Sequence, residues 1–301
     1  MGRRRHGPLD RRIVEVPLDV LELARGLSPD ALSGIATLEA ETVSADGGRL
    51  KLEWSVLNSR TLDDVSDVLW WEDGRLVGFI GLYSFGGNTV EVAGMVHPDF
   101  RRRGIGSRLL DEAMALCRDR GLLKLLLVAP RTSVGARRLA ELRHGFLEHS
   151  EHALDLDGVV SEGPSDPSLT LRPAVNDDAA RIVRLLEEAF GEPWGPLEEE
   201  VVGDSNLVGE RGGRVLATLR VNRSIDVWSI YGFAVEPQER GKGVGRDLLR
   251  RVCRQANEAG VMRLHLEVEV NNDRALGLYT SLGFTRTATD DYFEIPLFPT
   301  P

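Results

Sequence analysis

The chain has 301 residues, of which 42% are hydrophobic and 28% are charged. This composition is apolar enough for packed cores and excludes a wholly disordered chain, and at roughly 150 residues per domain the length predicts two domains. The 37 basic and 47 acidic residues give a formal net charge of −10, which argues against a nucleic-acid partner because the phosphate backbone repels an acidic protein.

The first residues, MGRRRHGPLDRR, are basic, and no apolar run follows them. We therefore interpret residues 1–12 as a disordered tail and not as a secretory signal. The apolar run at 122–129 is too short to cross a bilayer. Two cysteines supply neither a disulfide framework nor a four-cysteine metal site. These features predict a cytoplasmic protein without a membrane partner or a bound metal.

Two segments 139 residues apart repeat one pattern, since residues 95–106 read MVHPDFRRRGIG and residues 234–245 read AVEPQERGKGVG. The spacing is one domain length, so a duplicated domain explains it better than a short repeat. The positions that match are Val96 with Val235, Pro98 with Pro237, Arg101 with Arg240, Gly104 with Gly243, and Gly106 with Gly245.

The first half predicts a series of elements around its copy of the pattern. A hairpin turns at Asp73-Gly74, a strand covers 90–96, an amphipathic helix over 109–117 ends before Gly121, and a strand of LLKLLLV follows. A stretch rich in Gly, Pro, Ser and Asp at 157–168 then predicts a linker.

The second half predicts the same series after a first strand at 169–174 and a helix at 179–190, which Asn176, Asp177 or Asp178 caps. Its hairpin turns at Gly212-Gly213, a strand covers 228–235, a helix over 248–256 ends before Gly260, and a strand covers 263–270. We therefore predict an α/β (α+β) protein of two domains, 13–156 and 169–301, each with a mixed, largely antiparallel twisted sheet flanked by helices.

A glycine turn between a strand and a helix can bind an anion. Glycines permit positive φ and a close approach of the ligand, and the first N–H groups of the helix point outward with the helix dipole behind them. Such a turn suits a pyrophosphate. Its position about 70 residues into each half does not fit a Rossmann fingerprint, and neither copy ends in the Gly-Lys-Ser/Thr of a Walker loop.

The chain resembles a tandem member of the GNAT (GCN5-related) N-acetyltransferase superfamily over almost all of its length beyond the tail. The glycine turn matches the first signature of the family. The second signature matches NNDRALGLYTSLGF, at Asn272, Ala275, Leu278, Tyr279, Gly283 and Phe284. The resemblance implies that acetyl-CoA is the cosubstrate, with its pyrophosphate on the turn and its pantetheine arm along the end of the preceding strand.

The resemblance also implies the residues that bind the coenzyme in each half. Those of the second half are Phe233, Ala234, Val235, Arg240, Gly241, Lys242, Gly243, Val244, Gly245, Arg246, Asn272 and Tyr279. Those of the first half are Met95, Val96, Arg101, Arg103, Gly104 and Gly106.

The implied reaction is acetyl transfer to a primary amine of a small molecule, by direct attack in a ternary complex. Tyr279 is the expected proton donor to the leaving thiolate, and a backbone N–H near Ala234 or Val235 is the expected oxyanion donor. Asn272 is expected to cap the last helix and to face the coenzyme. A non-catalytic acyl-CoA sensor or scaffold is the alternative, but a pure binding protein does not need a proton donor at Tyr279.

The general base departs from the family pattern, because the position six residues before Val235 is Ser229. The candidates are Asp226, Tyr231, His265, Glu267 and Glu269, and the last three alternate onto one face of the predicted strand. That face is either open to solvent or to the other domain, or it is an acidic wall for a cationic amine. We favour Glu267 as the base.

The first half is predicted to be catalytically silent. Ala140 stands where the second half has Tyr279, and Ser133 stands near the asparagine position. Glu91 is its one obvious base candidate. We expect this half to keep coenzyme binding, and loss of that binding as well is the alternative. We also expect the stretches 26–62 and 188–206 to shape the acceptor groove, and the protein to be a monomer or a homodimer.

Overall fold

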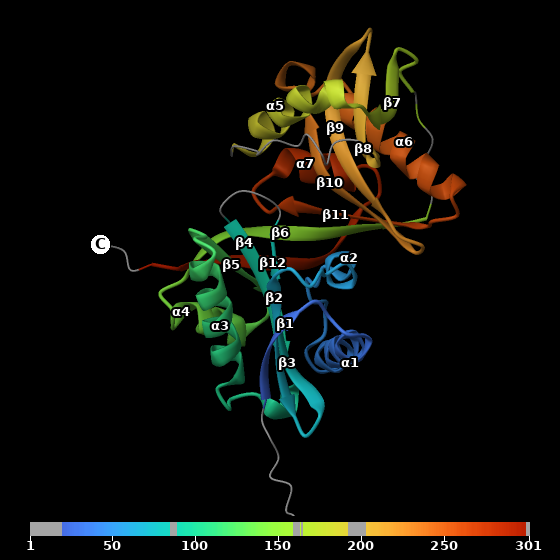
Figure 1. Cartoon of the computed structure of the whole chain (residues 1–301). Coiled ribbons are helices and arrows are strands. Elements are labelled where there is room, and N and C mark those ends of the chain that lie inside the picture. Colours follow the sequence, from blue (N-terminus) through green and yellow to red (C-terminus); the bar gives the residue numbers. More distant parts are fainter. Residues whose placement is uncertain (1–19, 85–88, 159–162, 164, 192–202, 299–301) are drawn as a thin grey trace, which may run out of the picture.

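The computed structural model describes residues 20–84, 89–158, 163, 165–191 and 203–298, and shows two α/β halves on one continuous sheet (Figure 1). The first half runs from β1 to β6 and the second from β7 to β12. The basic tail 1–12 lies outside the described residues, as do parts of the linker and of the 188–206 stretch.

The elements of the two halves follow nearly the same order. The strands of the first half are β1 (Val20–Arg25), β2 (Val65–Glu72), β3 (Arg75–Tyr83), β4 (Thr89–Val96), β5 (Lys124–Pro130) and β6 (Phe146–Asp157). Its helices are α1 (Pro29–Asp46), α2 (Trp54–Asn58), α3 (Ile105–Asp119) and α4 (Val134–Glu141), with the short 3₁₀ turn η1 (Pro98–Phe100).

The second half repeats this plan in the part of the chain that the structure describes. Its strands are β7 (Leu169–Ala174), β8 (Gly203–Arg211), β9 (Arg214–Arg223), β10 (Val227–Val235), β11 (Arg263–Glu269) and β12 (Thr285–Pro296). Its helices are α5 (Ala179–Phe190), α6 (Val244–Glu258) and α7 (Asp273–Thr280), with the 3₁₀ turns η2 (Asn176–Asp178) and η3 (Pro237–Glu239).

Both predicted hairpins form around two-residue turns in which both residues have positive φ. The angles are 51° and 75° at Asp73 and Gly74, and 57° and 77° at Gly212 and Gly213. Positive φ at both central residues is the geometry of a type I′ turn, whose twist matches that of the flanking strands. The predictions of β2–β3 and β8–β9 from these dipeptides are confirmed.

The sheet joins the halves by exchanging their last strands. Its order is β1-β2-β3-β4-β5-β12-β6-β11-β10-β9-β8-β7, so β12 lies between β5 and β6, and β6 lies between β12 and β11. The pairs β4–β5 and β10–β11 are parallel, and the others are antiparallel. The predicted fold class is confirmed. The boundaries 13–156 and 169–301 stay a prediction, since β12 belongs to the second half along the chain but completes the sheet of the first.

Helices cover both faces of this sheet. Helices α3, α4, α6 and α7 pack on one face, over the two largest clusters of buried apolar residues. Helices α1, α2 and α5 pack on the other face. Between α1 and α5, at the level of the exchanged strands, this second face carries charged side chains.

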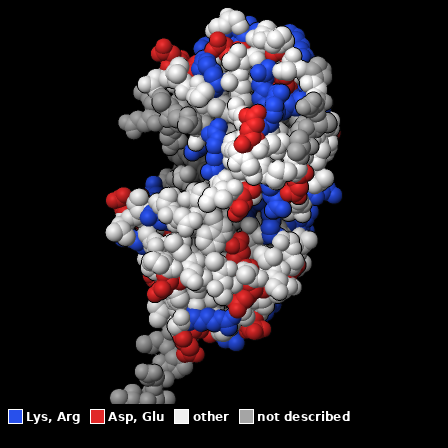
Figure 2. Space-filling model, turned by 90° about the vertical axis from the view of Figure 1, so that its right-hand side faces the viewer, with Lys and Arg blue, Asp and Glu red and all other residues white. Residues whose placement is uncertain are grey.

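The surface shows no gathering of one charge on the side seen in Figure 2, where acidic and basic side chains are interspersed over both halves. In the described part of the chain, no helix is both long enough and apolar enough to span a bilayer.

Candidate functional site

Both glycine turns have the geometry of an open anion site. Gly104 begins α3 with φ 85°, and Gly243 begins α6 with φ 88°. A β-carbon placed on either glycine would meet no atom within 4 Å, so the space in front of both helix N-termini is open. The turns therefore fit a phosphate group, which the first N–H groups of each helix would bind.

The arginines of the two turns differ in how much of their charge is available. In both halves the arginine Nε donates to the last carbonyl of the strand, at 3.0 Å for Arg101 to Val96 and 2.7 Å for Arg240 to Val235. Arg101 also forms two hydrogen bonds, of 2.8 and 2.7 Å, with the carboxylate of Asp46. Among the described residues, Arg240 has no acidic partner, so its terminal nitrogens are available to a ligand.

The remaining cations of the turns do not share this asymmetry, since each turn has one cation paired with a glutamate. In the first half, Arg103 lies 3.4 Å from Glu72. In the second half, Lys242 pairs with Glu239 at the surface, and Arg246 is half-buried in the first turn of α6. The sequence analysis missed Arg274, whose Nη2 would lie 3.2 Å from a β-carbon on Gly241.

The strands before the turns differ by one residue. Between the paired residues Tyr231 and Ala234, β10 has two residues where the facing stretch of β9 has one, and Gly232 adopts φ 55°. This β-bulge leaves an extra backbone unit unpaired and bends the strand. Strand β4 pairs with β3 without a register shift. Both strand ends run beyond their parallel neighbour, because β4 pairs with β5 only as far as Val92 and β10 with β11 only as far as Ile230. The difference between the halves is the bulge, which β10 has and β4 does not have.

The bulge lies where β10 and β11 separate. Their parallel pairing covers residues 227–230 of β10 and 263–266 of β11. Beyond it, the half-buried Phe233 and Val235 turn toward the start of α6, and a β-carbon on Gly245 would lie 3.4 Å from Phe233 and 3.6 Å from Val235. The expected coenzyme residues of the second half are thus brought together along one strand end, one turn and one helix start.

Helix α7 places Tyr279 in the core of the second half. Its side chain is 7% exposed and packs near Phe284, and its hydroxyl makes no hydrogen bond with the described residues. Burial raises the pKa of Tyr279 to about 12, so the phenol stays protonated and keeps a hydrogen to donate. Asn272 caps α7 by accepting a hydrogen bond from Ala275, as the prediction had it.

The corresponding helix of the first half lacks both groups. Ala140 takes the place of Tyr279 and is fully buried. Ser133 replaces Asn272 as the cap of α4 and accepts a hydrogen bond from Ala136. The first half therefore has a helix cap at this position, but it has no phenol.

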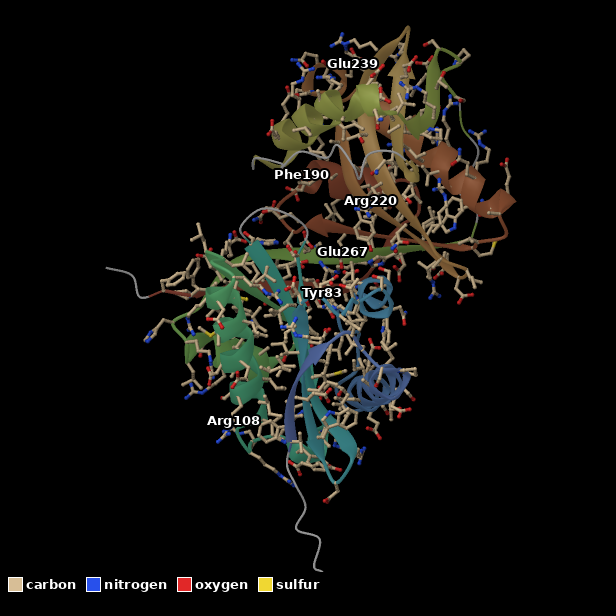
Figure 3. The ribbon with its side chains drawn as sticks, in the orientation of Figure 1. Tyr83, Arg108, Phe190, Arg220, Glu239 and Glu267 are labelled. Carbon is tan, nitrogen blue, oxygen red and sulfur yellow. The ribbon has the colours of Figure 1, made fainter. Side chains whose placement is uncertain are left out.

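The face that carries Glu267 is covered by the first half. Glu267 lies where the two halves meet (Figure 3). Its carboxylate pairs with Lys51, whose Nζ is 2.8 Å away, and with Arg49. Burial alone would raise the pKa of Glu267, but the charges of Lys51 and Arg49 and a bond to His265 hold it well below its usual range. This face is therefore in contact with the other domain, which was one of the two interpretations left open, and the acidic wall for a cationic amine stays a prediction.

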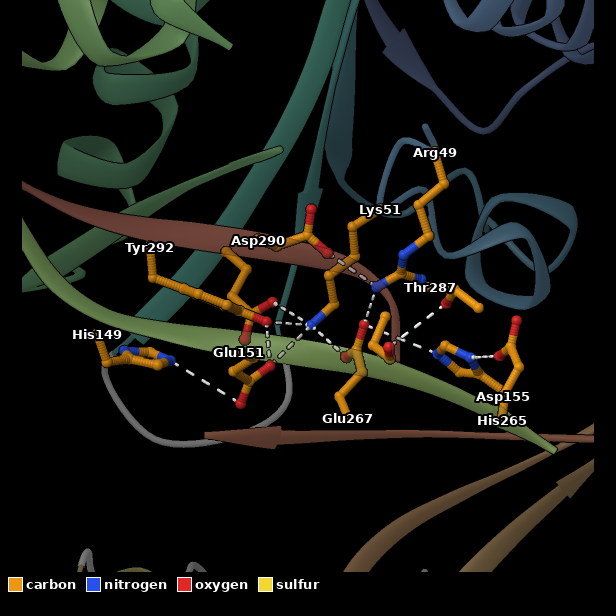
Figure 4. A network of polar contacts seen from close by, with 12 residues as sticks. Arg49, Lys51, His149, Glu151, Asp155, His265, Glu267, Thr287, Asp290 and Tyr292 are labelled. Carbon is orange, nitrogen blue, oxygen red and sulfur yellow. Dashed lines mark hydrogen bonds and ion pairs between the residues drawn. The ribbon is translucent and has the colours of Figure 1, made fainter. Parts of the chain in front are cut away.

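Lys51 is the centre of a larger ionic cluster, which we define as Arg49, Lys51, Glu91, Glu151, Glu267, Asp290 and Tyr292 (Figure 4). Its ammonium lies 3.6 Å from Glu151 and 3.7 Å from Glu91, and it donates to the hydroxyl of Tyr292. Arg49 donates to Asp290 at 2.8 Å. Burial raises the pKa of Glu91 to about 7, despite the nearby Lys51.

A histidine–aspartate pair lies beside this ionic cluster. The Nδ1 of His265 on β11 is 2.6 Å from Asp155 on β6, and its Nε2 is 3.8 Å from Glu267. Although burial lowers the pKa of His265, its bonds to Asp155 and Glu267 raise it above the usual value.

The other base candidates lie apart or are poorly suited. Asp226 and Glu269 are exposed. Ser229 lies opposite His265 in the parallel pair of strands, and burial raises the pKa of Tyr231 to about 12. In the first half, Glu91 pairs with Leu126, which is 139 residues before His265. Glu91 is thus the counterpart of Ser229. At this strand position the first half has a carboxylate and the second half has a hydroxyl.

The sequence analysis missed most of the ionic cluster. The alternation of Asp155 and Asp157 with Leu154 and Leu156 was a short signal for a strand with one polar face. Lys51 and Arg49 left no such signal, because the stretch before α2 has no alignable copy in the second half.

The family comparison identifies both halves. The model of the "Acetyltransferase (GNAT) family" matches residues 37–146 and 179–284. Among curated relatives, the mycothiol acetyltransferase of Kineococcus radiotolerans is 30% identical, with 91% of this chain and 96% of the relative covered. That of Amycolatopsis mediterranei is 31% identical, with 72% and 80% covered.

Solved structures share the fold of the whole chain. A GCN5-related N-acetyltransferase from Sphaerobacter thermophilus superposes with a TM-score of 0.78 at 21% identity, covering 94% of this chain and 97% of the other. A tandem GNAT protein from the clavulanic acid biosynthesis pathway superposes with a TM-score of 0.66 at 18% identity, covering 94% and 100%.

Proposed function

The chain belongs to the GNAT acetyltransferase family, whose acetyl donor is acetyl-CoA, and we propose that its second half transfers the acetyl group to a primary amine of a small molecule. The amine attacks the thioester directly in a ternary complex. The first half binds no acceptor for chemistry and supports the site of the second.

The bulge in β10 is the observation that carries this assignment. It lies where β10 and β11 separate, and a backbone N–H near Ala234 or Val235 is the proposed donor to the developing oxyanion there. Strand β4 also separates from β5, but it pairs with β3 without a bulge. Arg240, which has no acidic partner among the described residues, and the protonated Tyr279 lie in the same half.

The protein groups account for both proton movements. The acceptor ammonium must lose a proton before its nitrogen forms a bond with the acetyl carbon, and the sulfur must gain a proton as its bond with that carbon breaks. Tyr279 is the proposed donor to the sulfur, because its high pKa keeps the phenol protonated while remaining close enough to that of a thiol.

Glu267 remains the proposed first acceptor of the amine proton. Within the ionic cluster, four carboxylates, those of Glu91, Glu151, Glu267 and Asp290, contact two cations. This excess of negative charge suits a cationic acceptor. The low pKa of Glu267 makes it a weak base. It can therefore transfer a proton to another group but does not stay protonated itself.

The relatives named mycothiol acetyltransferase make a mycothiol-related amine the first acceptor to test. The specific proposal is therefore that the enzyme acetylates a mycothiol-related amine. The general proposal is that it acetylates some other small amine. Both rest on the same site in the second half.

The test is thiol release from acetyl-CoA over an amine library that includes mycothiol-related amines, with the wild type and Tyr279→Phe compared. We expect turnover that falls about 10²-fold in the variant, within the range for loss of a general acid, at unchanged KM for acetyl-CoA. Tyr83→Phe, a buried tyrosine of the first half, is the control. Tight coenzyme binding without turnover of any amine would instead support a sensor or scaffold.

A further inference from the structure

The exchanged strands bring a residue of the first half to a histidine of the second. Asp155 lies on β6 and His265 on β11, and the two are register partners whose side chains meet at 2.6 Å. The side chains are 21% and 16% exposed. Because the strand exchange is what places β6 beside β11, the second half would have no Asp155 without the first.

His265 lies next to the gap in which the reaction is proposed to take place. It pairs in register with Ser229, one position before the last paired residue of β11. Glu267 follows two positions later on the same face, just beyond that pairing. A proton on Glu267 therefore lies where β10 and β11 begin to separate, and the ring of His265 is its neighbour on the same strand face.

The Asp155 contact sets the tautomer of His265. A carboxylate accepts a hydrogen bond, so Nδ1 carries the hydrogen, and in the neutral ring the lone pair is on Nε2. Nε2 lies 3.8 Å from Oε1 of Glu267. This separation is longer than a hydrogen bond, so a proton would pass between the two groups through one bridging water.

The charges of Lys51 and Arg49 determine whether the proton resides on Glu267 or on His265. Both cations contact Glu267 and favour its ionised form. Asp155 instead favours the protonated form of His265. A proton that reaches this pair from outside therefore moves from the carboxylate to the imidazole.

We propose that His265, held by Asp155 of the first half, receives through Glu267 the proton that the acceptor ammonium loses. The ammonium releases one proton and becomes the nucleophilic amine, His265 becomes the imidazolium, and the proton then leaves to solvent. The first half thus supplies a working part of the second site. This role rests on the proposed acetyl transfer.

Charged groups act on His265 from three of the described segments. Asp155 faces it from β6 and Glu267 from its own strand, while Arg49 and Glu53 act on it from the stretch before α2. Strand β10 presents the uncharged Ser229. Among the described carboxylates, Asp155 is the one within hydrogen-bond distance, so it is the group to remove.

The experiment is the pH profile of kcat/KM for the wild type, His265→Gln and Asp155→Asn, with the best amine from the library. The wild type should lose activity on the acid side as His265 becomes protonated. Asp155→Asn should move this limb to lower pH and lower the plateau. His265→Gln should abolish the limb and lower the plateau about 10²-fold. His149→Gln is the matched control, since His149 lies on β6, pairs with Glu148 and stacks on Tyr292.

A second measurement does not depend on turnover. NMR titration of the His265 ring should give a pKa that falls in Asp155→Asn and stays unchanged in His149→Gln. A wild-type acid limb in His265→Gln, or an acid limb that stays in place in Asp155→Asn while the ring pKa moves, overturns this role and leaves the proposed function intact. Failure of every amine to turn over overturns the proposed function and this role with it.

Discussion

Lys51 of the first half and Glu267 of the second form an ion pair of 2.8 Å across the shared sheet, with side chains that are 11% and 12% exposed. The pair links a loop that has no copy in the second half to the strand that borders the proposed reaction site. The ionic cluster therefore holds the two halves together and also forms part of the proposed reaction site.

Replacing Lys51 by Met should destabilise the protein by about 3–5 kcal/mol, because removing one partner of a buried ion pair leaves uncompensated charge on the other. Glu91 and Glu151 would lose their lysine contact, while Glu267 would keep Arg49. The double variant Lys51→Met/Glu267→Gln should recover part of the loss. Urea unfolding measures both. Lys124→Met is the control, since Lys124 also contacts two carboxylates but is 24% exposed. An equal loss in the control would contradict a special role for Lys51.

Glu91 should make the stability of the protein depend on pH. Burial raises its pKa to about 7 in the folded chain, so between its ordinary value and about 7 the unfolded chain loses this proton and the folded chain keeps it. The free energy of unfolding therefore falls as pH rises through that window. In Glu91→Gln this fall should be smaller. Unfolding at pH 5 and pH 8 measures the difference in each protein.

The control for this pH dependence is Glu148, whose pKa shift has the opposite sign. Burial acts against the shift, but the bonds of Glu148 with Lys124 and His149 lower its pKa. Its contribution is present above the unfolded pKa and is lost as pH falls. Glu148→Gln should therefore not reduce the loss of stability between pH 5 and pH 8. If Glu91→Gln retains the whole of that loss, the origin assigned to it is wrong.

Local signals predicted most of the fold. The Asp73-Gly74 dipeptide predicts its hairpin because positive φ at both positions is a property of those two residues. The face of α6 formed by Leu248, Leu249, Val252, Cys253 and Ala256 is entirely buried, as its spacing predicts.

The strand exchange had no local signal. Strands β6 and β12 pair across more than a hundred residues of chain, as Asp155 with Thr285 shows. A polar strand face indicates that either solvent or a polar partner covers it, but the sequence does not show which of the two it is. For the same reason Glu267 could be chosen as a candidate from its spacing, while its partners Lys51 and Arg49 could not.

The two glycines at the starts of α3 and α6 offer a matched pair of substitutions. Gly104→Ala and Gly243→Ala should each cost about 1–2 kcal/mol, because both force a β-carbon into left-handed backbone. Only Gly243→Ala should raise the Kd of acetyl-CoA for the working site, by about tenfold. Calorimetric titration of both variants tests this. Equal losses of binding and turnover would show that the halves work alike.

Coenzyme binding in the first half stays a prediction, and Asp46 should control its strength. Asp46 is the last residue of α1, where a negative charge opposes the helix dipole, and it binds both terminal nitrogens of Arg101. A phosphate on this turn must compete with that carboxylate. Asp46→Asn should therefore strengthen binding in the first half about tenfold, since hydrogen bonds to charged groups are worth roughly 1.5–3 kcal/mol.

The measurement is acetyl-CoA titration of Asp46→Asn in the Gly243→Ala background, where the site of the second half is weakened. Stability should change by less than about 1 kcal/mol, because Asp46 is 49% exposed and exposed ion pairs contribute little. Glu72→Gln is the control, since Arg103 is exposed and lies 3.4 Å from Glu72. If Asp46→Asn gains no affinity over the parent, the carboxylate does not compete with the coenzyme and the role assigned to Asp46 is wrong.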